Sequence, residues 1–131
     1  MITALRTGIV TAAAGATGFD SEHVFYGERP GKTGYPYLVL FGISQQGTDR
    51  DALTNKEQFR IQFSVRDTTL AGVETAGAAL QAVFDYGESS ITVTGWTVHE
   101  SARNDIGLPA RKFNNVWAWD FDYNFQIHKA R

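Results

Sequence analysis

The sequence predicts an α+β fold, in which a mostly antiparallel sheet of four or slightly more strands carries two helices on one face. Two segments place apolar residues at the spacings of three and four that mark one side of a helix. Four other segments show the apolar runs or the strict alternation of β-strands. The predicted elements follow one another in the order α-β-β-α-β-β, which is typical of α+β folds.

The first part of the chain is predicted to form a helix and then a loop. Apolar residues recur at helical spacing from about Ile2 to Ala14, and the glycines that follow end the helix. The stretch from Gly15 to Tyr35 is rich in glycine and polar residues, so we interpret it as a connection. This connection contains a candidate short strand around Val24–Tyr26.

Two strands are predicted next. The continuous apolar run Tyr37–Phe41 indicates a strand covered on both faces. Glu57–Asp67 alternates apolar and polar residues, which indicates a strand with one face in water. The polar residues of Gly42–Lys56 are interpreted as the connection, which is longer than a tight hairpin needs and is therefore functional or mobile.

A second helix and two further strands complete the prediction. The helix spans about Leu70 to Tyr86, with an N-cap oxygen from a preceding threonine, Thr68 or Thr69. Ser90–Glu100 and Asn115–His128 are predicted strands, and the second carries six large apolar residues on one face that anchor the sheet. Ser101–Asn114 is interpreted as a long hairpin connection.

Composition excludes several classes of protein. The 131 residues are 43% hydrophobic, which is ordinary for one globular domain spanning residues 1–131. The net charge of -2 argues against a surface built mainly to neutralise phosphates. The absence of cysteine excludes disulfides, thiolate metal sites and a cysteine nucleophile. No targeting segment or apolar stretch long enough to span a membrane is visible, so we expect synthesis in the cytoplasm.

The histidines give no support for a metal site or a catalytic site. His23, His99 and His128 do not have the spacing that would bring two imidazoles onto one metal, so we predict no metal and no cofactor. His99 and Glu100 are neighbours that could act as a general acid or base. We favour the simpler interpretation, in which the two residues lie at a strand edge that faces water.

Asp120 and Asp122 stand two residues apart on a predicted strand, so both carboxylates project from one face. They could bind a divalent cation or share a proton. They could equally pair with Arg60 or Arg66 of a neighbouring strand, and we favour this structural interpretation.

No motif of a known enzyme class is present. The tripeptide from Gly31 to Thr33 resembles the end of a phosphate-binding loop, but position 26 is Tyr26 where that motif needs glycine. A nucleophile elbow, a zinc-hydrolase helix and a dinucleotide fingerprint are all missing. We therefore predict that the protein is not an enzyme.

Three segments together resemble a family of viral structural proteins. They are the apolar strand within Tyr35–Leu40, the alternating strand Phe59–Val65 that leads into an alanine-rich helix, and the closing aromatic strand Asp120–Phe125. The chain resembles the tail terminator and tail completion (head-tail joining, neck) proteins of long-tailed bacteriophages from about Met1 to His128.

The resemblance implies a function in the virion tail or neck. Family membership implies a homo-oligomeric ring, usually a hexamer, that caps the tail tube, stops its polymerisation and docks to the head completion or connector protein. DNA passes through such a ring without specific binding, and no membrane is involved. Ring contacts join two different surfaces, so charged loop residues are candidates for the interface. These candidates are Asp49, Arg50, Asp51, Arg103, Asp105, Arg111 and Lys112.

Other functions stay open. Each candidate charge could also serve solubility alone. The chain could be another phage neck, head completion or tail tube protein. It could also be a small α+β enzyme or ligand-binding domain that uses His99, Glu100 or Asp122 beside the aromatic sheet. A third possibility is an interaction module that binds a partner strand at an exposed sheet edge.

Overall fold

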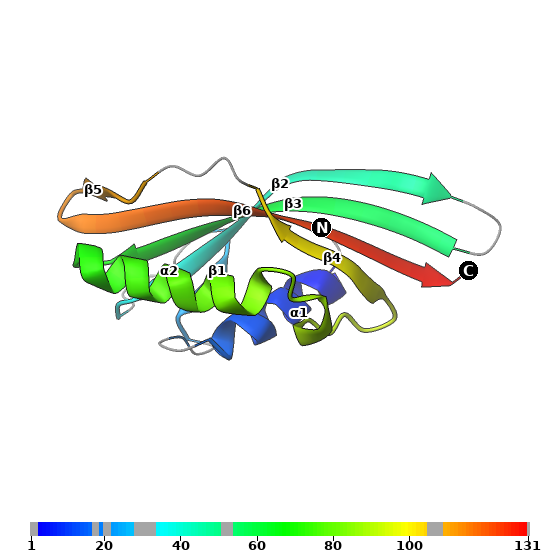
Figure 1. The fold of residues 1–131 in the computed structure, drawn as a ribbon, viewed down its shortest axis with the longest axis horizontal. Helices are drawn as coiled ribbons and strands as arrows, with labels where there is room; N and C mark the ends of the chain where they lie inside the picture. The colour runs from blue at the N-terminus through cyan, green and yellow to red at the C-terminus, as the bar shows by residue number, and fades with distance from the viewer. Residues whose placement is uncertain are drawn as a thin grey trace.

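The computed structural model describes residues 3–16, 19, 22–27, 34–50, 54–104 and 109–130. Within them the chain forms two α-helices, one 3-10 turn and a six-stranded mixed sheet (Figure 1). The helices are α1 (Thr3–Ala14) and α2 (Leu70–Phe84), and the turn is η1 (Glu88–Ser90). The strands are β1 (Val24–Tyr26), β2 (Tyr37–Arg50), β3 (Thr54–Asp67), β4 (Thr97–Arg103), β5 (Arg111–Phe113) and β6 (Val116–Ala130).

The predicted fold was wrong in the number of strands, in the order of elements along the chain and in the direction of one strand. The sheet has six strands, where four or slightly more were predicted, and their order is β1-β2-β3-β6-β4, with β5 paired to β6 as well. The short β1 pairs with β2 in parallel, so the sheet is mixed. A strand at Val24–Tyr26 was a candidate, but three residues carry too short a pattern to reveal a pairing direction.

The predicted polar connections were also wrong. Gly42–Lys56 is largely strand, because β2 continues to Arg50 and β3 begins at Thr54. β1 pairs only with Leu38–Leu40, so most of the β2–β3 hairpin extends past it. The residues of this part are mostly polar on both faces, and the sequence therefore shows no alternation of apolar and polar residues there. Ser101–Asn114 likewise contains the end of β4 and all of β5.

The predicted strand Ser90–Glu100 begins later than expected. Its first residue, Ser90, ends η1, and a tight turn follows in which the Trp96 amide donates to the Val93 carbonyl at 3.0 Å. Gly95 lies in this turn with φ +82°, a conformation that glycine adopts without steric cost. Strand pairing therefore starts only at Thr97.

The three long strands set up two different sheet faces. β3 pairs with β6 without a break from Thr54 to Asp67, and both helices lie on the same side of the sheet (Figure 1). Alternate residues of β3 and β6 point toward the helices and are buried. These residues are Phe59, Ile61, Phe63, Val65, Phe121, Tyr123, Phe125 and Ile127.

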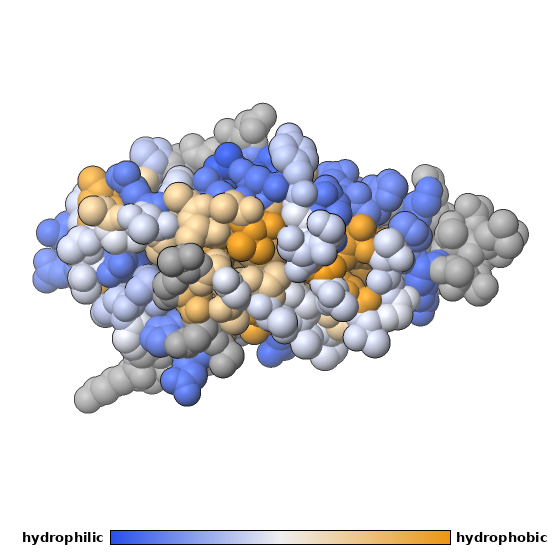
Figure 2. Space-filling model, turned by 60° about the horizontal axis from the view of Figure 1, so that its bottom comes forward, coloured by the Kyte–Doolittle hydropathy of each residue, from blue (hydrophilic) through white to orange (hydrophobic). Residues whose placement is uncertain are grey.

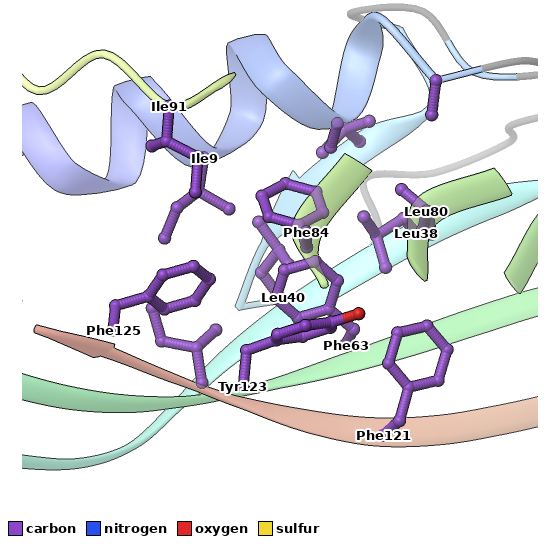
Figure 3. Packing of buried hydrophobic residues seen from close by; sticks show 14 of the residues in the cluster. Ile9, Leu38, Leu40, Phe63, Leu80, Phe84, Ile91, Phe121, Tyr123 and Phe125 are labelled. Carbon is purple, nitrogen blue, oxygen red and sulfur yellow. The ribbon is translucent and has the colours of Figure 1, made fainter. Parts of the chain in front are cut away.

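The centre of the core is aromatic. Phe63 of β3 contacts Phe84 of α2 edge to face, with ring centroids 4.9 Å apart, and lies at the same distance from Tyr123 of β6 (Figure 3). Leu5 and Ile9 of α1 belong to the same cluster and are fully buried. Aromatic contacts of this geometry add to the free energy of burial and fix the end of α2 on the sheet.

Gly77 allows α2 to approach the sheet closely. A Cβ atom at this position would lie 2.2 Å from the Trp119 ring of β6, which is closer than atoms can pack. We expect Gly77→Val to lower the free energy of unfolding by about 2–3 kcal/mol through overpacking. Ala78→Val is a matched control at the next, exposed position of the helix, where the expected loss is under about 1 kcal/mol. Urea unfolding of both variants measures the difference, and equal losses would contradict the close contact.

Candidate functional site

The sheet face opposite the helices, called the outer face below, carries a polar network. The buried Ser64 hydroxyl donates to the Asp120 carboxylate at 2.6 Å, and Arg66 donates to the same hydroxyl oxygen at 2.9 Å. Arg111 of β5 forms an ion pair with the other Asp120 oxygen at 3.4 Å. These contacts join β3, β6 and β5 across the outer face.

Asp122 extends this network along β6. Arg60 of β3 contacts its carboxylate at 2.6 Å, which confirms the predicted pairing of these acids with arginines on a neighbouring strand. Arg66 reaches Asp120 through Ser64, a residue that the prediction did not include. Over the described part of the chain, no three His, Asp or Glu side chains gather in a geometry that could hold a metal ion.

Aromatic side chains occupy the outer face at the β1 edge of the sheet. The Tyr37 ring lies 5.5 Å from that of Tyr35 and 6.4 Å from that of Phe25. Phe41, on the same face of β2, is 38% exposed. The outer face therefore changes from apolar to ionic between β2 and β6.

The edge of β2 is open over most of its length. β1 covers Leu38–Leu40, and no other described segment pairs with that side of β2. Ile43 lies at a bulge of β2 between Gly42 and Ser44, beyond the residues that β1 covers, and is 45% exposed. Open strand edges with apolar side chains are sites for pairing with another chain.

A cavity of about 210 Å³ lies beside this open edge. Gly42 lacks a side chain there, and a Cβ atom would approach the Tyr26 hydroxyl to 2.7 Å. The cavity is lined by Tyr26, Gly42, Ile43, Gln45, Phe59, Arg60 and Ile61. Its wall combines apolar side chains with the polar Gln45 and Arg60, and it offers space for a side chain that accompanies an added strand.

The edge of β4, on the other side of the sheet, is closed at its centre. The Ser101 carbonyl accepts a hydrogen bond from the Tyr86 amide at 2.9 Å, and the Ser101 amide donates to Glu88. The Ser101 hydroxyl donates to the Phe84 carbonyl at the end of α2 at 2.6 Å. The chain after α2 thus satisfies the backbone groups that an added strand would need.

A buried tyrosine connects this region to β6. The Tyr123 hydroxyl donates to the Asp85 carboxylate at 2.5 Å, and Arg103 contacts the other Asp85 oxygen at 3.3 Å. Burial raises the pKa of Tyr123 far above its ordinary value, and the hydrogen bond and negative charge of Asp85 raise this pKa further. Arg103 opposes this effect. The three side chains fix the end of α2 to the sheet.

The predicted interface residues fall in different places. Arg103 and Arg111 form the ion pairs with Asp85 and Asp120 given above, yet both keep exposed surface. Lys112 is exposed on β5. Asp49 and Arg50 belong to β2, but their side chains lie outside the described residues, as do Asp51 and Asp105 altogether. The interface assignment stays a prediction for all seven.

The fold brings together two histidines that are far apart in sequence. The rings of His99 on β4 and His128 on β6 lie 5.5 Å apart between centroids, although their spacing gave no sign of it. The contact follows from strand pairing. Thr97 of β4 is in register with His128 of β6, and the bulge that follows in β4 contains His99. Gly31–Thr33, rejected as a phosphate loop, lies outside the described residues.

The helical side of the molecule has apolar surface across its middle and hydrophilic residues at its margins (Figure 2). A wide hollow of about 780 Å³ follows α1, and none of the described residues that line it is charged. No described helix is both long and apolar enough to cross a membrane.

Comparison with known proteins gives a structural likeness without a sequence match. No protein-family model matches the chain, and no curated protein matches it. The fold is similar to that of a chain from a solved structure described as the virion of a native gene transfer agent particle. The TM-score is 0.62 at 14% sequence identity, and the likeness covers 95% of this chain and 89% of the other. The two chains therefore share a fold over nearly their whole lengths.

Removal of the Tyr123 hydroxyl tests its role at the end of α2. We expect Tyr123→Phe to lower the free energy of unfolding by about 1 kcal/mol, since one hydrogen bond to a charged, part-buried acceptor is lost. Because the raised pKa keeps Tyr123 protonated in the folded state, its contribution is complete below about pH 10 and declines as pH rises further. Tyr86→Phe is the control, since Tyr86 is 83% exposed. Urea unfolding at neutral and alkaline pH measures both variants, and equal behaviour would contradict this role.

Proposed function

We propose that the protein is a non-enzymatic structural component of a phage-like virion, and specifically a tail terminator subunit. The observation that carries the proposal is the fold shared with a gene transfer agent virion chain over nearly the full length of both. The terminator assignment rests in addition on the resemblance of the three sequence segments described above. It places the protein in the tail or neck of the virion.

In this proposal the subunits form a closed ring, with six copies as the expected number. A ring joins two different surfaces of each subunit, and the two sides of this sheet do differ. One side offers the open edge of β2 with exposed Phe41 and Ile43, whereas the other is closed at Ser101. Contact with a neighbour would cover the open edge, which is otherwise a site for uncontrolled association.

Charged residues at the two sides would fix the register between neighbours. The candidates remain the seven residues predicted from the sequence, of which Arg103, Arg111 and Lys112 have described side chains near β4 and β5. Opposite charges across such a contact favour the correct partner more than they add affinity. The tail tube protein and the head connector are the further partners of the proposed ring, and DNA passes through it without specific binding.

Substitution at the open edge tests the assembly contact. We expect the purified protein to form rings of about six subunits, alone or on purified tail tubes, visible by light scattering and negative-stain imaging. Ile43→Lys places a charge at the contact and should shift the assembly to monomers. Leu70→Lys is a matched control, because Leu70 is an aliphatic residue of similar exposure, 40% against 45%, at the start of α2.

The outcome distinguishes the ring from other modes of assembly. Rings that are lost with Ile43→Lys and kept with Leu70→Lys support the proposal. A protein that stays monomeric both alone and with tail tubes contradicts the terminator assignment. Open tubes of stacked rings would instead indicate a tail tube protein.

A further inference from the structure

A small cavity on the outer face has a chemistry that the proposed assembly does not use. It measures about 250 Å³ and is lined by Lys56, His99, Gln126 and His128. The cavity lies near the ends of β3 and β6 that are farthest from β5, away from the network around Asp120. Each lining side chain can donate a hydrogen bond from nitrogen.

Strand register builds this cavity from three strands. Lys56 of β3 is directly in register with His128 of β6, and Gln126 lies two residues earlier on the same face. His99 stands at the β4 bulge between Val98 and Glu100. The bulge brings its ring to 5.5 Å from that of His128, with 75° between the ring planes.

The surrounding charges favour an anion. Lys56 carries a permanent positive charge, and no described carboxylate lines the cavity. Glu100 follows His99 in β4 but does not belong to the lining, and the Lys129 ammonium lies over the Trp96 ring, 4.8 Å from its centroid. A metal ion would find two imidazoles beside an ammonium group, with no third His, Asp or Glu among the described residues. The donor set therefore fits an oxyanion better than a cation.

We propose that Lys56, His99, Gln126 and His128 form a binding site for a phosphate group. The Lys56 ammonium and the Gln126 amide donate to phosphate oxygens, and each imidazole donates from one ring nitrogen. Free phosphate and the phosphates of a nucleic acid backbone share this chemistry.

Titration with inorganic phosphate, followed by NMR of the imidazole nitrogens, tests the site at constant ionic strength. We expect the His99 and His128 signals to move saturably. Lys56→Gln should weaken binding about tenfold, as expected for the loss of one charge-assisted hydrogen bond. His128→Gln should also weaken it. Arg6→Gln is the control, because Arg6 is an exposed cation of α1 on the opposite side of the sheet, and it should bind as the unmodified protein does.

A second titration with a short DNA duplex identifies the source of the phosphate. If the duplex moves the same signals and Lys56→Gln weakens the effect, the site binds a nucleic acid backbone. If inorganic phosphate alone moves them, the site binds free phosphate. The proposal is overturned if chloride moves the signals equally, or if Lys56→Gln binds phosphate as tightly as the unmodified protein. It is also overturned if zinc binds at the two histidines and phosphate does not.

Discussion

The unbroken pairing of β3 with β6 is the constraint on which the rest of the structure depends. Its register runs from Thr54 to Asp67 and aligns the alternation of both strands, so that the four apolar residues at the centre of β3 each meet an apolar residue of β6. These pairs are Phe59 with Phe125, Ile61 with Tyr123, Phe63 with Phe121 and Val65 with Trp119. A slip of β6 by one residue would turn Asp120 and Asp122 into the core and move Phe121 into water. The same register therefore creates both the aromatic core under the helices and the ionic network on the outer face.

Irregularity is confined to the strands beside this pair. β2 shifts register between Gly42 and Ser44 and again between Gly47 and Arg50, and β4 does so between Val98 and Glu100, whereas β3 and β6 pair without a shift. A bulge turns side chains away from simple alternation, and two of these places put a residue where the surface has distinctive chemistry. Ile43 of β2 lines the cavity beside Tyr26, and His99 of β4 lines the cavity beside Lys56. After the β4 bulge, Ser101 points toward the end of α2 and Arg103 toward Asp85.

The sequence was informative where a segment borders the core. The two helices and the alternating part of β3 and β6 lie close to their predicted ranges. In these segments, buried residues such as Leu80 and Phe121 recur at regular intervals among residues that face water. The polar half of the β2–β3 hairpin has no such contrast, so Gln45 and Gln46 gave no strand signal although they pair in register. The parallel pairing of β1 depends on tertiary structure alone. The same division holds for side chains, since the contact of Arg60 with Asp122 follows from alternation but that of His99 with His128 requires the bulge.

The difference between the two edges of the sheet limits how copies of this chain can associate. If β2 and β4 were both open, β2 of one copy could add to β4 of the next, and sheets could grow without a geometric stop. Ser101 accepts a hydrogen bond from the Tyr86 amide and donates one to Glu88, and these two bonds remove that route at the centre of β4. In the proposed ring, a neighbour would then meet the β2 edge with side chains or with a segment other than the centre of β4. A fixed angle is what allows a chain of heterologous contacts to close into a ring.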